Sequence, residues 1–183
     1  MKDQLKNIIL KKRNSLAKDE ILEKSGKIKE RLFNLGVYKK SKTVMFFVSF
    51  KNEVNTHSII KEALKSKNVV VPKIVQNEIE PSIIIDFENL VEGKFGIFEP
   101  IEIMRIAYKN IDAVLVPGIV FDKNGHRIGY GFGYYDKFLR KVPKAAKIGL
   151  AFDFQVVDNI PKEEHDVAVD FIVTDERIIE CRR

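Results

Sequence analysis

Three alternating glycines between a buried strand and a helix constrain this chain more than any other feature. The loop at residues 125–136 follows the apolar run 113–116 and leads into residues 134–140, which can form a helix. A loop that enters a helix presents backbone N–H groups and the positive end of the helix dipole, and both favour phosphate. Glycine lets the backbone take positive φ and come close to a ligand. The stretch therefore predicts an α/β unit with an anion site at the start of the helix.

Glycine spacing alone also fits a loop that turns tightly and serves packing only. The loop is not a P-loop, because no G-K-[ST] follows the glycines, and it lacks the G-x-G-x-x-G dinucleotide fingerprint. Arg127, Tyr134, Tyr135 and Asp136 share the same few residues, whereas a flexible linker would be rich in Gly and Ser. These side chains favour the ligand site, in which Asp136 can hold a divalent cation beside phosphates.

Two amphipathic helices are predicted ahead of the first strand. Apolar residues recur at helical spacing over residues 2–15 and 18–35, and lysine or arginine fills the opposite faces. Gly36 is expected to cap the end of the second helix. On periodicity alone, Lys2 and Lys6 are ordinary surface charges of the first helix.

A strand–helix–strand unit follows these helices. Residues 43–50 are apolar throughout and predict a strand buried on both faces. A helix is expected at about 56–65 with Asn55 as its N-cap, and residues 69–72 form the next strand. Such a unit is right-handed and places its ligand edge at the carboxyl ends of the strands, where Glu53 lies. Further strands are predicted at 83–85 on an edge, 113–116, 147–152 and 171–174.

Alternating strands and helices predict an α/β protein with a largely parallel sheet. The 183 residues suit one domain, residues 1–183, without repeats or linkers. One cysteine and an N-terminus without the apolar core of a signal peptide lead us to expect a cytoplasmic protein with no membrane span. The charge of +6 comes from lysines interleaved with acidic residues, so we expect no nucleic-acid partner and, at most, attraction of small anionic substrates.

Two stretches together resemble a known signature. Residues 117–122 read PGIVFD and residues 125–136 read GHRIGYGFGYYD. This long pattern resembles the signature of the 5-formyltetrahydrofolate cyclo-ligase family, also called methenyltetrahydrofolate synthetases. The resemblance extends over nearly the whole chain. It implies a three-layer αβα fold like that of ribose isomerases and CoA transferases.

The resemblance also implies where ATP and Mg²⁺ bind. Cyclo-ligases open with a Lys-x-x-x-Arg pair that reaches ATP, and Lys2-x-x-x-Lys6 matches its spacing with lysine in place of arginine. Lysine keeps the charge and loses the bidentate fork. Metal contacts fall on Asp136 and Asp170. The implied nucleotide contacts are Lys2, Lys6, Arg127, Gly129, Gly131, Phe132, Gly133, Tyr134 and Tyr135.

The folate side is implied in the same way. The resemblance places Glu53 on the pterin, where a carboxylate accepts two N–H bonds, although a loop carboxylate at a helix N-terminus is also favoured by the dipole. Phe50, Tyr130 and Tyr134 are the other implied substrate contacts. Aromatic residues stand at 130 and 132, where relatives often carry Arg or Lys. The GIFEP segment at 96–100 matches a family element, so the rings of Phe95 or Phe98, or Ile97, can line the folate or pack in the core.

The implied reaction is the ATP-driven cyclisation of 5-formyltetrahydrofolate, which can carry a polyglutamate tail, to 5,10-methenyltetrahydrofolate. ADP and phosphate are released, and Arg127 and Tyr134 are the implied catalytic residues in a monomeric enzyme. Two alternatives stay open. One is a nucleotide- or nucleic-acid-binding module that uses the loop aromatics for stacking. The other is an isomerase or CoA transferase on the same scaffold, which the GYYD motif disfavours.

Overall fold

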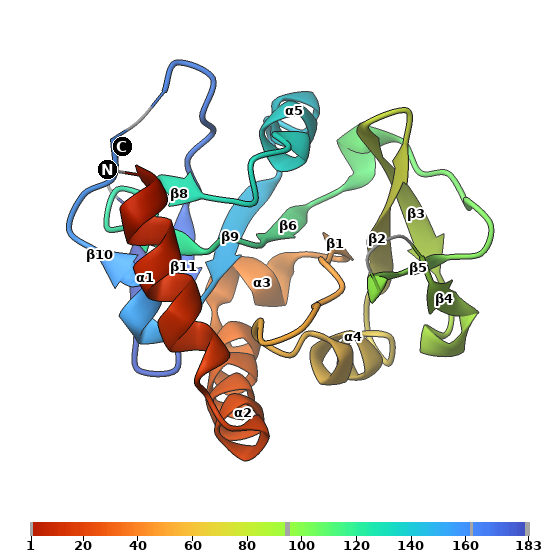
Figure 1. The fold of residues 1–183 in the computed structure, drawn as a ribbon. Coiled ribbons are helices and arrows are strands. Elements are labelled where there is room, and N and C mark those ends of the chain that lie inside the picture. Colours follow the sequence, from red (N-terminus) through yellow and green to blue (C-terminus); the bar gives the residue numbers. More distant parts are fainter. Residues whose placement is uncertain (1, 94–95, 162, 182–183) are drawn as a thin grey trace.

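A central sheet organises the chain (Figure 1). The structure is a computed structural model that describes residues 2–93, 96–161 and 163–181, so Phe95 lies outside the described residues. Within these residues seven strands form one sheet in the order β12-β11-β9-β6-β1-β2-β3. The strands in chain order are β1 (Thr43–Met45), β2 (Asn68–Val75), β3 (Glu78–Ile84), β6 (Ala113–Val116), β9 (Ala146–Leu150), β11 (Phe171–Val173) and β12 (Ile178–Glu180).

The five inner strands are parallel, and only the edge strands β3 and β12 run antiparallel to their neighbours. Strand β1 passes through α4 (His57–Ala63) to its parallel neighbour β2, as the strand–helix–strand pattern predicted. The chain then moves to the other side of β1, where β6 pairs with it. The strand order therefore reverses between β1 and β6, and open α/β sheets bind ligands at the carboxyl ends of the strands beside such a reversal.

Both faces of the sheet are covered, which explains the continuous apolar runs of the inner strands. One face packs on α2 (Lys18–Asn34), α3 (Gly36–Lys40) and α4 through residues such as Ile28, Tyr38 and Ile59. The other face packs on α5 (Tyr134–Lys141) through Phe138 and Leu139. Figure 1 shows α2, α3 and α4 on one side of the sheet and α5 on the other. The predicted α/β fold with a largely parallel sheet and helices on both faces is confirmed.

Helix α1 (Lys2–Asn14) packs away from the main sheet. Its Ile9 joins Ile119, Val120 and Ile128 in a small apolar cluster. Those three residues belong to or adjoin a second sheet of the described residues, whose strand order is β10-β7-β8. This arrangement fixes the basic helix α1 beside the strands that lead into the glycine loop. The second sheet comprises β7 (Val120–Asp122), β8 (Arg127–Ile128) and β10 (Val156–Val157), and β4 (Leu90–Glu92) pairs with β5 (Phe98–Pro100) elsewhere.

Three local predictions were wrong. The expected strand at 43–50 ends at Met45, although Phe46 to Val48 stay buried. Beyond it, the Thr56 hydroxyl donates to the Phe47 carbonyl and accepts the Ser49 N–H, so a side chain replaces sheet pairing there. Gly36 begins α3 and does not cap α2, which ends with Leu35 in extended backbone.

The third concerns the start of α4. Thr56 is the N-cap residue, while the Asn55 side-chain oxygen accepts the N–H of His57. Thr56 makes no capping bond with its side chain, so Asn55 satisfies the first N–H of the helix while the Thr56 hydroxyl holds the segment after β1. No helix within the described ranges is long and apolar enough to cross a membrane.

Candidate functional site

Glu53 lies where the strand order reverses. It follows β1, and it lines a narrow gap together with Pro117 and Gly118, which follow β6. Glu53 is only 8% exposed. Burial acts most strongly on this carboxyl and raises its pKa, while the Phe50 N–H, the charge of Arg13 and the Tyr130 hydroxyl act in the opposite direction. Perturbed carboxyls in a cleft are frequent at functional sites.

Arg13 and Tyr130 complete the surroundings of Glu53. Nη2 of Arg13 donates to the Tyr130 hydroxyl at 2.7 Å, and that hydroxyl donates to Oε1 of Glu53 at 3.0 Å. Oε2 of Glu53 accepts the Phe50 N–H at 2.9 Å. The three side chains, here called the Arg13–Tyr130–Glu53 cluster, come from α1, the glycine loop and the segment after β1.

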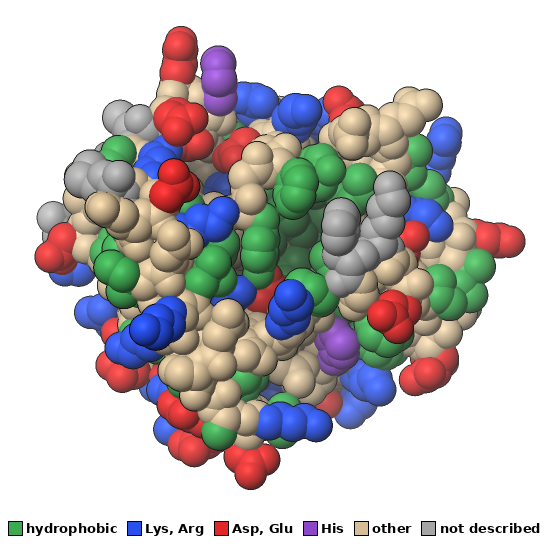
Figure 2. Space-filling view, viewed as in Figure 1, with side chains coloured by type: hydrophobic (Ala, Val, Ile, Leu, Met, Phe, Trp, Pro, Cys, Tyr) green, Lys and Arg blue, Asp and Glu red, His purple; other side chains and the backbone are tan. Residues whose placement is uncertain are grey.

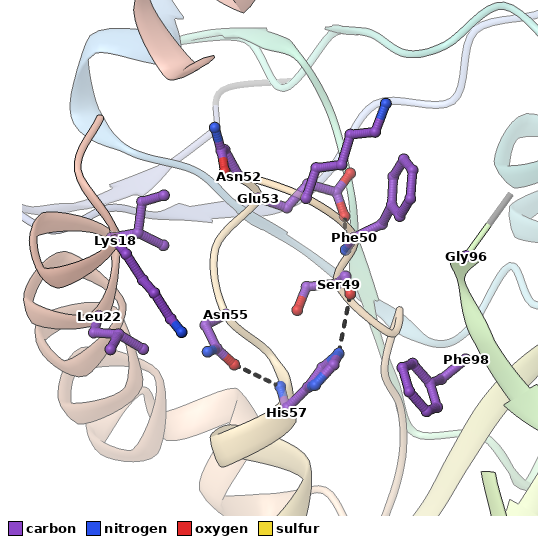
Figure 3. Close-up of a pocket in the computed structure, with 12 residues that line it drawn as sticks. Lys18, Leu22, Ser49, Phe50, Asn52, Glu53, Asn55, His57, Gly96 and Phe98 are labelled. Carbon is purple, nitrogen blue, oxygen red and sulfur yellow. Dashed lines mark hydrogen bonds between the residues drawn. The ribbon is translucent and has the colours of Figure 1, made fainter. Parts of the chain in front are cut away.

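A pocket of about 440 Å³ opens beside Glu53. This volume is in the range of small-molecule sites. Figure 3 shows Phe50 and Phe98 near Gly96 on one side of the pocket and Lys18 and Leu22 of α2 on the other. Figure 2, which views the molecule from the same side as Figure 1, shows a hollow near the centre with hydrophobic side chains on its walls.

His57 and Ser49 form the polar floor between these walls. The imidazole Nε2–H of His57 donates to the Ser49 carbonyl at 3.0 Å, while the ring lies 5.2 Å from Phe87 and 5.8 Å from Phe98. The pocket therefore offers aromatic walls and polar atoms around one buried carboxylate, which suits a flat ring with N–H groups at its edge.

The glycine loop contains two kinds of glycine. A Cβ on Gly125 would lie 2.3 Å from the carbonyl oxygen of Val169, so this glycine is needed for packing. A Cβ on Gly129, Gly131 or Gly133 would meet nothing within 4 Å. Gly131 and Gly133 have positive φ, but Gly129 does not. The described protein thus gives no packing or backbone reason for glycine at 129, which argues against a loop built for packing alone.

Arg127 and Asp136 form a pair at the base of this loop. Nη2 of Arg127 donates to Oδ1 of Asp136 at 2.8 Å, and Nη1 donates to the Val167 carbonyl at 2.6 Å. The same Asp136 oxygen accepts the Val167 N–H at 3.0 Å. Arg127 is 9% exposed, so it braces the first turn of α5 against the segment that contains Val167.

The two lysines of the predicted Lys-x-x-x-Lys pair differ in their surroundings. Nζ of Lys2 lies 2.8 Å from Glu163 and 3.8 Å from Asp166, and the hydrogen bond to Glu163 is the main cause that raises its pKa. Nζ of Lys6 donates to the backbone carbonyl of Tyr130 at 3.4 Å. Lys6 therefore lies against the glycine loop, while Lys2 is held by acidic partners.

The loop aromatics point in different directions. Phe132 is 61% exposed, and its ring stacks on Tyr134 at 5.3 Å between centroids. Tyr135 packs inward against the core on both faces of the sheet, and its hydroxyl is buried without a hydrogen-bond partner among the described residues. Burial and the nearby charge of Glu53 raise the pKa of Tyr135. Tyr135 is thus a neighbour of the carboxylate, while half-buried Tyr134 packs against the core and carries the exposed ring of Phe132 on its face.

Asp170, the second predicted metal ligand, lies at the amino ends of β9 and β11. Its Oδ2 accepts the N–H of Lys147 at 2.8 Å, and its own N–H bonds the Lys147 carbonyl. Glu53 lies at the opposite ends of the parallel strands. Among the described residues, no group of three or more His, Cys, Asp or Glu side chains could hold a metal ion. The structure therefore does not bring Asp170 to the end of the sheet where Glu53 lies.

Sequence reasoning missed Arg13. A signal was present: Leu5, Ile9, Arg13 and Leu16 recur at helical spacing, so Arg13 occupies the apolar face of α1. The helix buries Ile9 and Arg13. A charge on an apolar stripe has a buried partner in most proteins, because an unpaired buried charge is unfavourable. Lys18 and His57, which line the pocket, carried no comparable signal.

The fold and the pocket define an α/β protein with a ligand site where the strand order of a parallel sheet reverses. The model of the 5-formyltetrahydrofolate cyclo-ligase family matches residues 1–175. The chain belongs to this family of enzymes. It is 31% identical to the probable 5-formyltetrahydrofolate cyclo-ligase of Schizosaccharomyces pombe, with 97% of each chain covered.

Solved structures agree with this assignment. The 5,10-methenyltetrahydrofolate synthetase of Aquifex aeolicus matches with a TM-score of 0.90 and 37% identity, over 100% of this chain and 93% of that one. The synthetase of Mycoplasma pneumoniae matches with a TM-score of 0.76 and 30% identity, over 95% and 98%. The family predicted from the glycine-loop signature is confirmed.

Proposed function

We propose that this protein is a 5-formyltetrahydrofolate cyclo-ligase that uses ATP and Mg²⁺ to form 5,10-methenyltetrahydrofolate, ADP and phosphate. Family membership supports the folate substrate, because relatives at 31% and 37% identity carry the names cyclo-ligase and methenyltetrahydrofolate synthetase. The match to residues 1–175 in one piece supports a single catalytic domain.

One observation carries the nucleotide half of the proposal. The Cβ positions of Gly129, Gly131 and Gly133 face open space, and the loop leads directly into α5. A backbone without side chains on that side can bring its N–H groups against phosphate oxygens. Lys6 of α1 contacts the loop backbone and adds positive charge there. Lys2 would have to leave its acidic partners to do the same.

The folate half rests on Glu53 and its pocket. An ionised carboxylate can accept two N–H bonds from the edge of a pterin ring. Phe50 lies next to Glu53 in the pocket wall and can pack against the ring. Tyr130 reaches the same carboxylate from the glycine loop. The two halves of the site are therefore adjacent, as a reaction between the two substrates requires.

The chemistry then needs alignment more than covalent help from the protein. The γ-phosphoryl group of ATP transfers to the formyl oxygen, which turns a poor leaving group into a phosphate. N10 of the folate attacks the activated carbon to form the new C–N bond and loses its proton, and the C–O bond breaks to release phosphate. The chain supplies donors from the glycine loop and holds the folate ring through Glu53. We also propose Tyr134, the first residue of α5 directly after Gly133, as a substrate contact.

The contacts of Arg127 and Asp136 favour particular roles for these two residues. Arg127 is buried with both terminal nitrogens engaged, so we propose that it supports catalysis by fixing Asp136 at the start of α5. Mg²⁺ would neutralise charge on the phosphates when bound. Asp136 is the residue that would hold it, because it adjoins the loop and only its Oδ1 is committed to hydrogen bonds within the described chain. Asp170 as a ligand stays a prediction.

A spectrophotometric assay tests the proposal. The purified protein is mixed with 5-formyltetrahydrofolate, ATP and Mg²⁺, and the near-ultraviolet band of the methenyl product is followed. We expect a rise that needs all three components. A folded protein that binds ATP without any such rise would contradict the proposed reaction and favour a nucleotide-binding module.

A further inference from the structure

The Arg13–Tyr130–Glu53 cluster contains two charged side chains that are almost fully buried. Arg13 is 3% exposed and Glu53 is 8% exposed. The Tyr130 hydroxyl stands between them, 2.7 Å from Nη2 of Arg13 and 3.0 Å from Oε1 of Glu53. A phenol that accepts from a guanidinium donates more strongly to a carboxylate, since hydrogen bonds in a chain polarise one another. The arrangement suits a negative charge on Glu53.

Without these partners a buried carboxylate would tend to be protonated. A protonated carboxyl has one oxygen turned into a donor, so it can no longer accept two N–H bonds from one ring edge. The ionisable groups that face Glu53 are Arg13 of α1, Tyr130 of the glycine loop and Tyr135 of α5. Of these, Arg13 is the one that carries positive charge.

The hydrogen bonding of the cluster is incomplete. Nε of Arg13 is buried without a hydrogen-bond partner in the described chain. Among the described residues, Arg13 reaches Glu53 through the hydroxyl of Tyr130 and lacks the direct bidentate bonds that make the strongest Arg–carboxylate pairs. Glu53 lines both the pocket and the narrow gap beside it, and Arg13 lines the gap, so the cluster adjoins the pocket.

We propose that Arg13 and Tyr130 are positioning residues for Glu53, which keep its carboxylate ionised and aimed so that it can accept the N–H groups of the folate ring. The proposal rests on the proposed function, in which Glu53 binds that ring. Arg13 supplies the positive charge, and the Tyr130 hydroxyl, polarised by Arg13, donates to one oxygen of the Glu53 carboxylate and fixes its position. Neither residue needs to touch the reacting atoms.

The first test measures Glu53 in the free protein and does not depend on activity. Glutamate side chains are labelled with ¹³C, and the carboxyl signal that disappears in Glu53→Gln is followed by NMR from pH 4 to 9. In Arg13→Met we expect the titration midpoint to rise by about one to three units, the effect of removing an opposite charge nearby. Tyr130→Phe should raise it less, and Arg13→Lys should restore most of the wild-type value.

A matched control removes a neighbouring charge. Lys11 lies on the same helix, is exposed, and has no side-chain contact with the cluster. Lys11→Met should leave the Glu53 midpoint unchanged. Circular dichroism confirms that each variant is folded. If Arg13→Met does not fold, Tyr130→Phe and Arg13→Lys still decide the question.

The second test follows kcat/KM for 5-formyltetrahydrofolate against pH. The acidic limb should move to higher pH in Arg13→Met and Tyr130→Phe by the same amount as the NMR midpoint, and the loss should fall on the KM for folate. A merely structural role would lower turnover at every pH without moving this limb.

The two tests distinguish failure of the positioning proposal from failure of the proposed function. Unchanged Glu53 midpoints in both Arg13→Met and Tyr130→Phe would overturn the proposal, whatever the enzyme does. A wild-type KM for folate in Glu53→Gln would remove Glu53 from the binding site and so contradict the proposed function, even where the NMR midpoints shift as expected.

Discussion

Replacing Gly129 by alanine separates a ligand role of the glycine loop from a structural one. A Cβ at this position meets nothing within 4 Å, and the backbone φ is not positive. The free energy of unfolding should therefore fall by no more than about 0.5 kcal/mol, as for other surface substitutions without strain. Alanine also restricts the unfolded chain, which contributes up to about 1 kcal/mol in favour of the variant.

Binding of ATP should respond differently. If the N–H groups at 129–133 lie against phosphate oxygens, a methyl group at 129 occupies the space through which the ligand approaches. The loss of one hydrogen bond to a charged group weakens binding by about 1.5–3 kcal/mol. This corresponds to a Kd for ATP that is roughly 10- to 150-fold higher. Calorimetric titration of ATP gives the Kd, and urea unfolding gives the stability of the same preparation.

Gly125→Ala is the matched control from the same loop. Its Cβ would lie 2.3 Å from the backbone oxygen of Val169, and its φ is +88°. Backbone has to move, so we expect a loss of stability well beyond the 1–3 kcal/mol that positive φ costs alone. A Gly129→Ala variant with normal stability and a wild-type Kd for ATP would refute the argument that glycine at 129 serves the phosphates.

Three further variants test the remaining parts of the site. Asp136→Asn weakens the bond to buried Arg127, so the free energy of unfolding should fall by about 1–3 kcal/mol. Half-maximal turnover should also need a higher Mg²⁺ concentration. An unchanged Mg²⁺ requirement would exclude Asp136 as the ligand. Burial raises the pKa of Glu53 above the ordinary 4.5, so wild-type stability is lost as pH rises through the folded pKa. The Tm of Glu53→Gln relative to wild type should therefore increase with pH, and a pH-independent difference in scanning fluorimetry would contradict the burial argument. Phe132→Ala removes an exposed ring that stacks on Tyr134, so the stability of the protein should not change. If the ring stacks on the adenine base, the KM for ATP should rise roughly tenfold or more. An unchanged KM for ATP would exclude that contact.

The fold was largely predictable because its signals are local and repeated. The apolar runs at 113–116 and 171–174 gave strands, and the spacing of residues in 18–35 gave a helix, each within a few residues of its observed bounds. The run at 43–50 misled because burial and sheet pairing share one apolar signal. Its last residues are bonded by the Thr56 hydroxyl, and a single side chain in a later turn leaves no periodic mark.

The site was predictable only in part. The glycine loop and Glu53 were identified from a specific signature and from the carboxyl end of a strand, and the structure brings them together through Tyr130. The partner of Glu53 was missed because Arg13 is 40 positions away on a helix that reads as a basic surface. The family resemblance implied that Arg127 contacts the nucleotide, and the sequence does not show that the Val167 carbonyl accepts a hydrogen bond from its side chain.

Tyr130 links the two halves of the proposed site. It stands between Gly129 and Gly131, so any shift of the backbone at these glycines would also move the hydroxyl that bonds Glu53. The reaction requires the formyl oxygen and the γ-phosphoryl group to meet in one geometry. An enzyme with independent pockets would have to position each substrate separately. Here one loop residue contacts the carboxylate proposed for folate while its neighbours face the space proposed for phosphate, so the position of each substrate constrains that of the other.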